Sequence, residues 1–126
     1  MKKDIEDAED IKQLVNSFYS EVQQDELIGY IFNDVAKVNW EKHLPIMYNF
    51  WETLLLGKTS FIGNPMLKHR MLSKKTPLAK EHFDRWLQLW HTTIDASFAG
   101  SVAEAAKIRS KSIADLMWYK ISQQHV

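Results

Sequence analysis

The sequence contains no cysteine, and this absence excludes several kinds of chemistry at once. Disulfides, thiolate nucleophiles, iron–sulfur clusters and thiolate zinc sites all require that residue, and a chain without it fits a reducing compartment. The longest aliphatic run is the leucine stretch 54–56, whereas a membrane-spanning helix needs about 20 apolar residues. The N-terminal "MKKDIEDAED" turns acidic after its lysines and has no apolar core for a signal peptide. We therefore expect a cytoplasmic protein that does not enter a membrane.

Neither sign of charge is in excess, because 16 Lys and Arg balance 16 Asp and Glu. The chain therefore has no strongly basic field to attract nucleic acid or an anionic membrane. It also has no phosphate-binding glycine loop, no nucleophile-elbow pattern and no pair of carboxylates placed for acid–base hydrolysis. With 126 residues it is long enough to bury a core. We expect one domain over residues 1–126, present as a monomer or a weak oligomer.

Aromatic residues are what the sequence has in quantity, with five Trp, four Tyr and six Phe. Large aromatic side chains fill the cores of many proteins. They also form the walls of sites that bind a planar ligand. Composition leaves both interpretations open.

The periodicity of the apolar residues predicts an all-α fold, since nothing alternates as a strand does. A first helix carries an apolar stripe from Ile11 to Val22, and "ELIGYIFNDV" (26–35) predicts a turn or two of helix. The next helix covers about Trp40 to Leu56, and Gly57 is its expected end. Pro45 cannot donate a backbone hydrogen bond, so regular helix is expected to begin near it or to bend there.

The second half predicts two further long helices after a segment punctuated by Gly and Pro. Thr76 is the expected N-cap of the first, with Pro77 at its first position and Gly100 as its end. Ser101 and Glu104 predict a capping box at the start of the last helix. The apolar face of that helix is expected to consist of Ala105, Ala106, Ile113, Leu116 and Met117.

Histidine is the residue that suggests a metal site, although none of the five has a compact ligand spacing. A lone histidine is more often a surface or hydrogen-bonded pocket residue than a ligand. His43 and His69 differ from the others because each stands among apolar residues in a poorly regular place. Neutral imidazole is a good iron ligand, so two histidines across an aromatic slot would suit a planar metal complex.

Tyr19 and Trp86 each lie on the apolar stripe of a predicted helix. The simpler interpretation is that both are core residues. The alternative is that the phenol and the indole N–H donate hydrogen bonds into a cavity, where a ligand is their partner. Three further aromatics without that polar role are core or cofactor wall: Phe32, Phe50 and Trp51.

Several strings in order along the chain resemble the third group of truncated haemoglobins. They are "FYSEV", "WEKHLPIMYNFWETLLLG", "FIGNPMLKHRML", "HFDRWLQLW" and "AKIRSKSIADLM". The resemblance implies a truncated globin fold, in which two helices pack over two and enclose haem b (iron protoporphyrin IX).

Carried over residue by residue, the resemblance implies roles for individual side chains. His69 would be the metal ligand on the proximal side, with Tyr19 and His43 on the opposite side and Trp86 as a further hydrogen-bond donor. His82 stands in a familiar string but is not expected to be a ligand. The remaining implied haem-pocket residues are Phe32, Met47, Phe50 and Trp51.

The function expected from this resemblance is binding of oxygen, nitric oxide or carbon monoxide at haem iron. Redox chemistry of the nitric oxide dioxygenase or peroxidase type, with a partner reductase, is a hypothesis. Two alternatives stay open: a non-haem metal-binding helical bundle, and a haem-free globin-like interaction or sensor module. Arg70 and Arg85 are candidates for pairing with the haem propionates.

Overall fold

The computed structural model describes residues 2–35, 37–57 and 78–124 of the chain. Its elements are α1 (Ala8–Gln24), the short π-helix η1 (Ile31–Val35), α2 (Trp40–Leu56), α4 (Lys80–Ser97) and α5 (Ser101–Gln124). Within those ranges the regular structure is helical throughout, which confirms the predicted all-α class. The segment Pro65–Leu72 with His69 and Arg70, and the predicted cap Thr76 and Pro77, lie outside the described residues.

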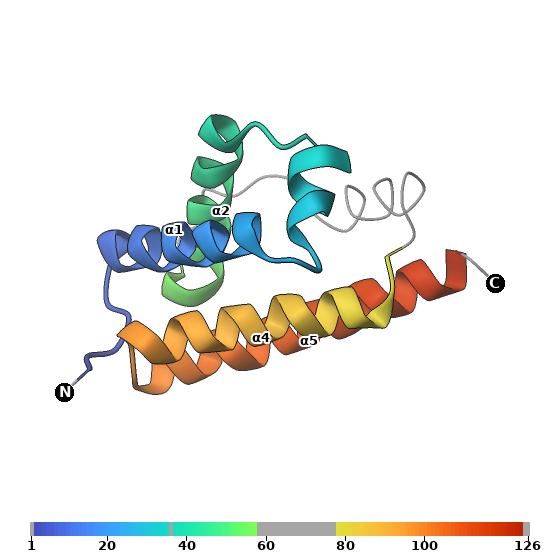
Figure 1. The fold of residues 1–126 in the computed structure, drawn as a ribbon. Helices are drawn as coiled ribbons and strands as arrows, with labels where there is room; N and C mark the ends of the chain where they lie inside the picture. The colour runs from blue at the N-terminus through green and yellow to red at the C-terminus, as the bar shows by residue number, and fades with distance from the viewer. Residues whose placement is uncertain (1, 36, 58–77, 125–126) are drawn as a thin grey trace.

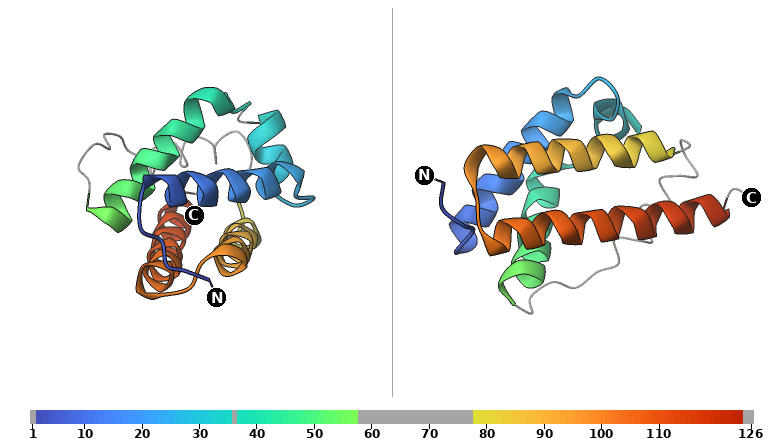
Figure 2. Two further views of the ribbon diagram at one scale, coloured as in Figure 1. Left: turned by 90° about the vertical axis from the view of Figure 1, so that its left-hand side faces the viewer. Right: turned by 90° about the horizontal axis from the view of Figure 1, so that it is seen from below.

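The helices form two layers. α4 and α5 are an antiparallel pair, and α1 and α2 lie across it, as Figures 1 and 2 show from three directions. α1 packs on both α2 and α4, while α2 also reaches α5. This is the two-over-two arrangement that the resemblance implied. In the part of the chain that the structure describes, no helix is both long and apolar enough to cross a bilayer.

α1 forms where the apolar stripe predicted it. Its N-cap is Asp7, whose carboxylate accepts a hydrogen bond from the Asp10 backbone N–H at 3.0 Å. All members of the stripe are buried: Ile11, Leu14, Val15, Phe18, Tyr19 and Val22. The following ten-residue string gives only the single turn η1, in agreement with the turn or two expected from it.

α2 spans Trp40–Leu56 as predicted, so of the two expectations for Pro45 a start at the proline is not observed, and the helix begins five positions ahead of it. The backbone N–H of His43 already donates to the Asn39 carbonyl at 2.9 Å in the first turn. Pro45 is tolerated because only the hydrogen bond to the Glu41 carbonyl is forfeited so near the N-terminus. Gly57 ends the helix in the left-handed conformation, with φ of 74°, as predicted.

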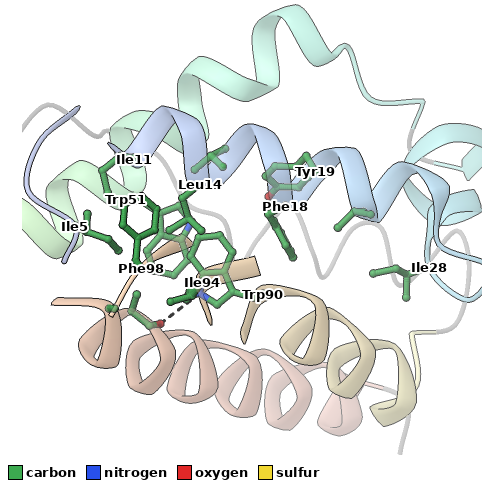
Figure 3. Close-up of a cluster of buried hydrophobic side chains, with 14 of the residues drawn as sticks. Ile5, Ile11, Leu14, Phe18, Tyr19, Ile28, Trp51, Trp90, Ile94 and Phe98 are labelled. Carbon is green, nitrogen blue, oxygen red and sulfur yellow. Dashed lines mark hydrogen bonds between the residues drawn. The ribbon is translucent and has the colours of Figure 1, made fainter. Parts of the chain in front are cut away.

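The core lies between the two layers and is built on large rings. Trp90 of α4 is fully buried, and Phe18 and Trp51 approach it from α1 and α2 with ring centroids at 4.9 and 4.6 Å (Figure 3). The Trp90 indole N–H donates to the Ala106 carbonyl of α5 at 3.4 Å. One side chain therefore contacts all four long helices, and burial of its apolar surface holds the layers together.

α4 starts later than predicted. Its first residue is Lys80, preceded by Ala79, so Thr76 is not the N-cap. The free backbone N–H of Ala79 donates instead to Nδ1 of His82 at 2.8 Å, which places this imidazole in a capping role. The helix ends at Ser97, and Gly100 follows in the turn with φ of 142°.

The predicted capping box of Ser101 and Glu104 is wrong. The start of α5 is capped by Asp4, whose carboxylate accepts the backbone N–H groups of Val102 at 2.9 Å and Ala103 at 2.8 Å. The Ser101 hydroxyl also donates to Asp4, instead of capping its own helix. A carboxylate held there by the N-terminal segment outcompetes the local hydroxyl because it carries a full charge.

The N-terminal segment 2–7 is a strap across the turn between α4 and α5. Its Ile5 side chain is buried, the Ala99 N–H donates to the Lys3 carbonyl, and Lys3 pairs with Asp10.

One prediction for the apolar face of α5 is wrong, since Leu116 is 51% exposed and lies on the outer face. The buried residues of α5 are Ala103, Ala106, Ser110, Ala114, Met117 and Ile121.

Candidate functional site

Four aromatic rings meet at one end of the α1–α2 interface. We call Tyr19, Phe32, Trp40 and His43 the ring cluster; they come from α1, η1 and the first turn of α2. The Tyr19 centroid lies 5.3 Å from that of Trp40, 5.4 Å from that of His43 and 6.2 Å from that of Phe32. These distances are typical of aromatic contacts. The predicted pocket residues Tyr19, Phe32 and His43 are therefore brought together by the fold.

Tyr19 is the most enclosed member of the ring cluster, with 5% of its surface exposed. Burial raises the pKa of its phenol well above the ordinary value of 10.0, so the hydroxyl keeps its proton at neutral pH. This hydroxyl makes no hydrogen bond with another residue that the structure describes. A buried phenol normally has a hydrogen-bond partner, so this group is suited to donate to a bound ligand.

Trp86 provides a second donor from α4, in the other layer of the molecule. Its ring lies edge-on to Phe18 at 5.6 Å and parallel to Trp90 at 6.4 Å. The Trp90 N–H is bonded to a carbonyl, whereas the Trp86 N–H has no acceptor within residues 2–35, 37–57 and 78–124. Trp86 is also only half-buried. Trp90 thus has a structural role, and Trp86 retains a free donor.

Several large apolar side chains that pack against the core keep accessible surface. Met47 and Phe50 are half-buried on α2, as is Phe83 on α4. Such residues are what a flat, mostly apolar cofactor would cover. Trp51 differs, because only 3% of it is exposed and its ring stacks on Trp90 at 24° between planes. In this structure Trp51 is part of the core that supports the site.

Arg85 is already engaged in an ion pair. Its Nε and Nη2 atoms lie 2.7 and 2.6 Å from Oδ1 of Asp25, whose other oxygen accepts the backbone N–H groups of Leu27 and Ile28. Burial alone would raise the pKa of Asp25, but these hydrogen bonds outweigh it and hold that pKa below 3.8. Arg85 therefore secures the end of α1 to α4, which makes it a poor candidate for a propionate partner.

The remaining histidines offer no alternative metal site in the described part of the chain. His82 uses Nδ1 to accept the Ala79 N–H, and the enclosed Nε2 of His91 has no hydrogen-bond partner. Among residues 2–35, 37–57 and 78–124, no three His, Asp or Glu side chains gather closely enough to hold a metal ion.

Sequence reasoning missed Trp40, which contacts every other member of the ring cluster. A signal was present, since Trp40 stands three positions before His43 and residues at that spacing share a helix face. It also missed Phe18, treated only as a stripe residue, which lies edge-on to Tyr19, Trp86 and Trp90.

Comparison with known proteins identifies the family. The family model described as bacterial-like globin matches residues 3–119. The chain belongs to the bacterial-like globin family. This match covers the ring cluster, most of the strap and most of α5, so the whole of the site described above lies within the globin sequence.

Two comparisons place this globin near the third group of truncated haemoglobins. It is 30% identical over 117 residues to the group 3 truncated haemoglobin of Campylobacter jejuni, which covers 90% of each chain. The crystal structure of group III truncated haemoglobin from the same organism matches with a TM-score of 0.83 and 27% identity, covering 96% of this chain and 95% of that one. The predicted family resemblance and truncated globin fold are confirmed.

Proposed function

We propose that this globin binds haem b and holds oxygen as a diatomic ligand beside Tyr19 and His43. The observation that supports it is the buried Tyr19 hydroxyl, a neutral donor with no acceptor in the described chain, in the middle of the ring cluster. Membership of the globin family and the half-buried apolar side chains of α2 and α4 support haem as the cofactor. When bound, haem supplies an iron with an open position for a small gas molecule.

His69 is the proposed iron ligand. It lies outside the described residues, so its role rests on the family resemblance of "FIGNPMLKHRML". The proposed haem wall consists of Phe32, Met47 and Phe50, with Trp51 supporting it from the core. Carbon monoxide and nitric oxide are the other proposed ligands.

Tyr19 and Trp86 are proposed to donate hydrogen bonds to the ligand. Both donors are neutral and fixed in aromatic packing, so they are oriented before the ligand arrives. A ligand with partial negative charge is stabilised most, because hydrogen bonds to charged acceptors are the stronger ones. His43 stands beside Tyr19 at the start of α2, and we propose that it controls access to the pocket.

Strong donors slow the release of a ligand, which favours chemistry on the ligand over simple delivery. We therefore propose redox turnover of the nitric oxide dioxygenase or peroxidase type, with electrons from a reductase, in a cytoplasmic protein formed by residues 1–126 as one domain. Multiple turnovers with a reductant would support this part, and stoichiometric reversible binding alone would contradict it.

The experiment that tests haem binding is titration of the purified protein with hemin, followed by the Soret band with and without dithionite and carbon monoxide. We expect a Soret band at a ratio of one hemin per chain. His69→Ala should lose it or weaken hemin binding strongly, while Tyr19→Phe should keep hemin and release oxygen faster. His82→Ala is the matched control, since its imidazole already accepts the Ala79 N–H, and it should keep the band.

Loss of the Soret band in His82→Ala with retention in His69→Ala would overturn the proposed ligand. Absence of any Soret band in the parent protein would overturn haem binding as a whole. It would then favour one of the two alternatives. The non-haem helical bundle should bind iron or zinc, and the haem-free interaction or sensor module should bind neither.

A further inference from the structure

Trp40 is a half-buried member of the ring cluster, and it links three elements of the fold. Its ring lies 6.1 Å from Phe32 of η1 with 29° between planes, so the two stack. It lies 5.3 Å from Tyr19 of α1 and 5.6 Å from His43 in its own helix. Trp40 is half-buried, as are Phe32 and His43, whereas Tyr19 is enclosed.

His43 is held edge-on between two rings. Its plane makes 83° with Tyr19 at 5.4 Å and 81° with Trp40 at 5.6 Å. T-shaped contacts of this kind are favourable because the positive edge of one ring meets the negative face of another. If His43 swung out of the pocket, both contacts would be lost.

Of the two rings that contact His43, that of Trp40 is the less firmly fixed, because of its position in the sequence. Tyr19 is fixed in the apolar stripe of α1, which is buried along its whole length. Trp40 occupies the first position of α2, where helix ends fray and side chains move at low cost. Its stacking on Phe32 ties that end of α2 to η1, and thereby sets where the His43 ring lies.

We propose that Trp40 is a positioning residue that holds His43 against Tyr19 and so keeps the entrance to the ligand pocket closed. The inference rests on the proposed function for its effect on ligand entry. Its structural part, the placement of His43 by Trp40, concerns the chain's own residues. Aromatic pairs of this kind shift an equilibrium by about two- to tenfold, which sets the size of the expected effect.

The first test is rebinding of carbon monoxide after flash photolysis of the haem-loaded protein. Trp40→Leu keeps apolar bulk without a ring and should raise the association rate about two- to tenfold. Trp40→Phe keeps a ring and should stay close to the parent. Tyr119→Leu is the control, because Tyr119 is an aromatic residue that is 58% exposed on α5 and belongs to no part of the proposed pocket, and it should leave the rate unchanged.

The decisive comparison repeats Trp40→Leu in a His43→Ala background. If Trp40 acts through His43, Trp40→Leu should not raise the association rate any further once the imidazole is absent. An equal rate increase in both backgrounds would show that Trp40 is only a wall of the entrance, and would overturn the proposal. No rate change in the parent background would overturn it as well.

A second measurement does not depend on haem. Nuclear Overhauser contacts between the Tyr19 and His43 ring protons should be present in the parent protein as purified, kept in Trp40→Phe and weakened severalfold in Trp40→Leu. Retention of full intensity in Trp40→Leu would overturn the proposal. If the protein takes up no hemin, the proposed function fails, while this measurement still decides the placement of His43 by Trp40.

Discussion

Asp4 and Ala103 are 99 positions apart, yet the Asp4 carboxylate accepts the Ala103 backbone N–H at 2.8 Å. The same carboxylate accepts the N–H of Val102, so two of the free donors at the start of α5 are satisfied by a residue of the N-terminal strap. This contact secures the strap to the pair of helices that forms one layer of the fold (Figure 1).

Replacement of Asp4 should destabilise the protein through the cap alone. We expect Asp4→Ala to lower the free energy of unfolding by about 1 to 2 kcal/mol, measured by urea denaturation followed by circular dichroism. Asp4→Asn keeps an acceptor oxygen and should lose less. Equal losses in the two variants would indicate that the charge of Asp4, and not its hydrogen bonding, stabilises α5.

Gly100 should be intolerant of a side chain for two separate reasons. Its φ of +142° is rarely adopted by other residues, and a Cβ there would lie 2.5 Å from Cγ of Asp4. We expect Gly100→Ala to cost about 1 to 3 kcal/mol of stability.

A matched control separates the two reasons. Gly57 has φ of +74°, and no residue that the structure describes comes within 4 Å of its Cβ position, so Gly57→Ala should show only the backbone cost, about 1 kcal/mol. In an Asp4→Gly background the Gly100→Ala cost should fall, because all three Asp4 atoms that would meet the added Cβ are then absent. If Gly100→Ala lost as much stability in that background as in the parent, backbone conformation would be the whole cause of the loss.

Acid should weaken the fold through Asp25. Its pKa lies below the ordinary 3.8 in the folded protein, so the folded state favours the ionised carboxylate. The stabilisation that Asp25 provides is fully present at pH values above the pKa of its carboxyl in the unfolded chain. It is lost as the pH falls through the pKa of the same carboxyl in the folded protein. Asp25→Asn should therefore be less stable at neutral pH, with a flatter decline in stability below about pH 4.

The control for this prediction is Asp115→Asn, which breaks an exposed pair with Lys111 on the outer surface of α5. Pairs of that kind contribute little, so the acid profile should match the parent. Measurement of the unfolding free energy at several pH values checks both variants. An Asp25→Asn profile parallel to that of the parent would contradict the prediction.

Local pattern was enough to predict most of the fold. The stripe of α1, the span of α2 and the stop at Gly57 each depend on residues within a turn or two of one another. The predictions at Thr76 and Ser101 failed because other groups satisfied the free backbone donors: the His82 imidazole at α4, and Asp4 at α5. The partner of such a donor is set by tertiary packing, which a local motif does not contain.

The site was predictable only in part, for a similar reason. Family resemblance, and not periodicity, singled out Tyr19 and His43, and the structure places their rings 5.4 Å apart. Trp40 went unnoticed because its partners come from α1 and η1, and its i,i+3 relation to His43 became informative only once those elements were in place. The role of His69 stays a prediction, since this residue lies outside the described part of the chain.

The capping of α5 by Asp4 has a consequence for how the chain matures on the ribosome. Asp4 is synthesised long before Val102 and Ala103, so its carboxylate has no backbone N–H groups of α5 to accept until those residues are made. Contacts between such distant positions form late, because a long loop must close first. A nascent chain halted before α5 would hold its N-terminal segment undocked, because the backbone groups that Asp4 caps would not yet exist.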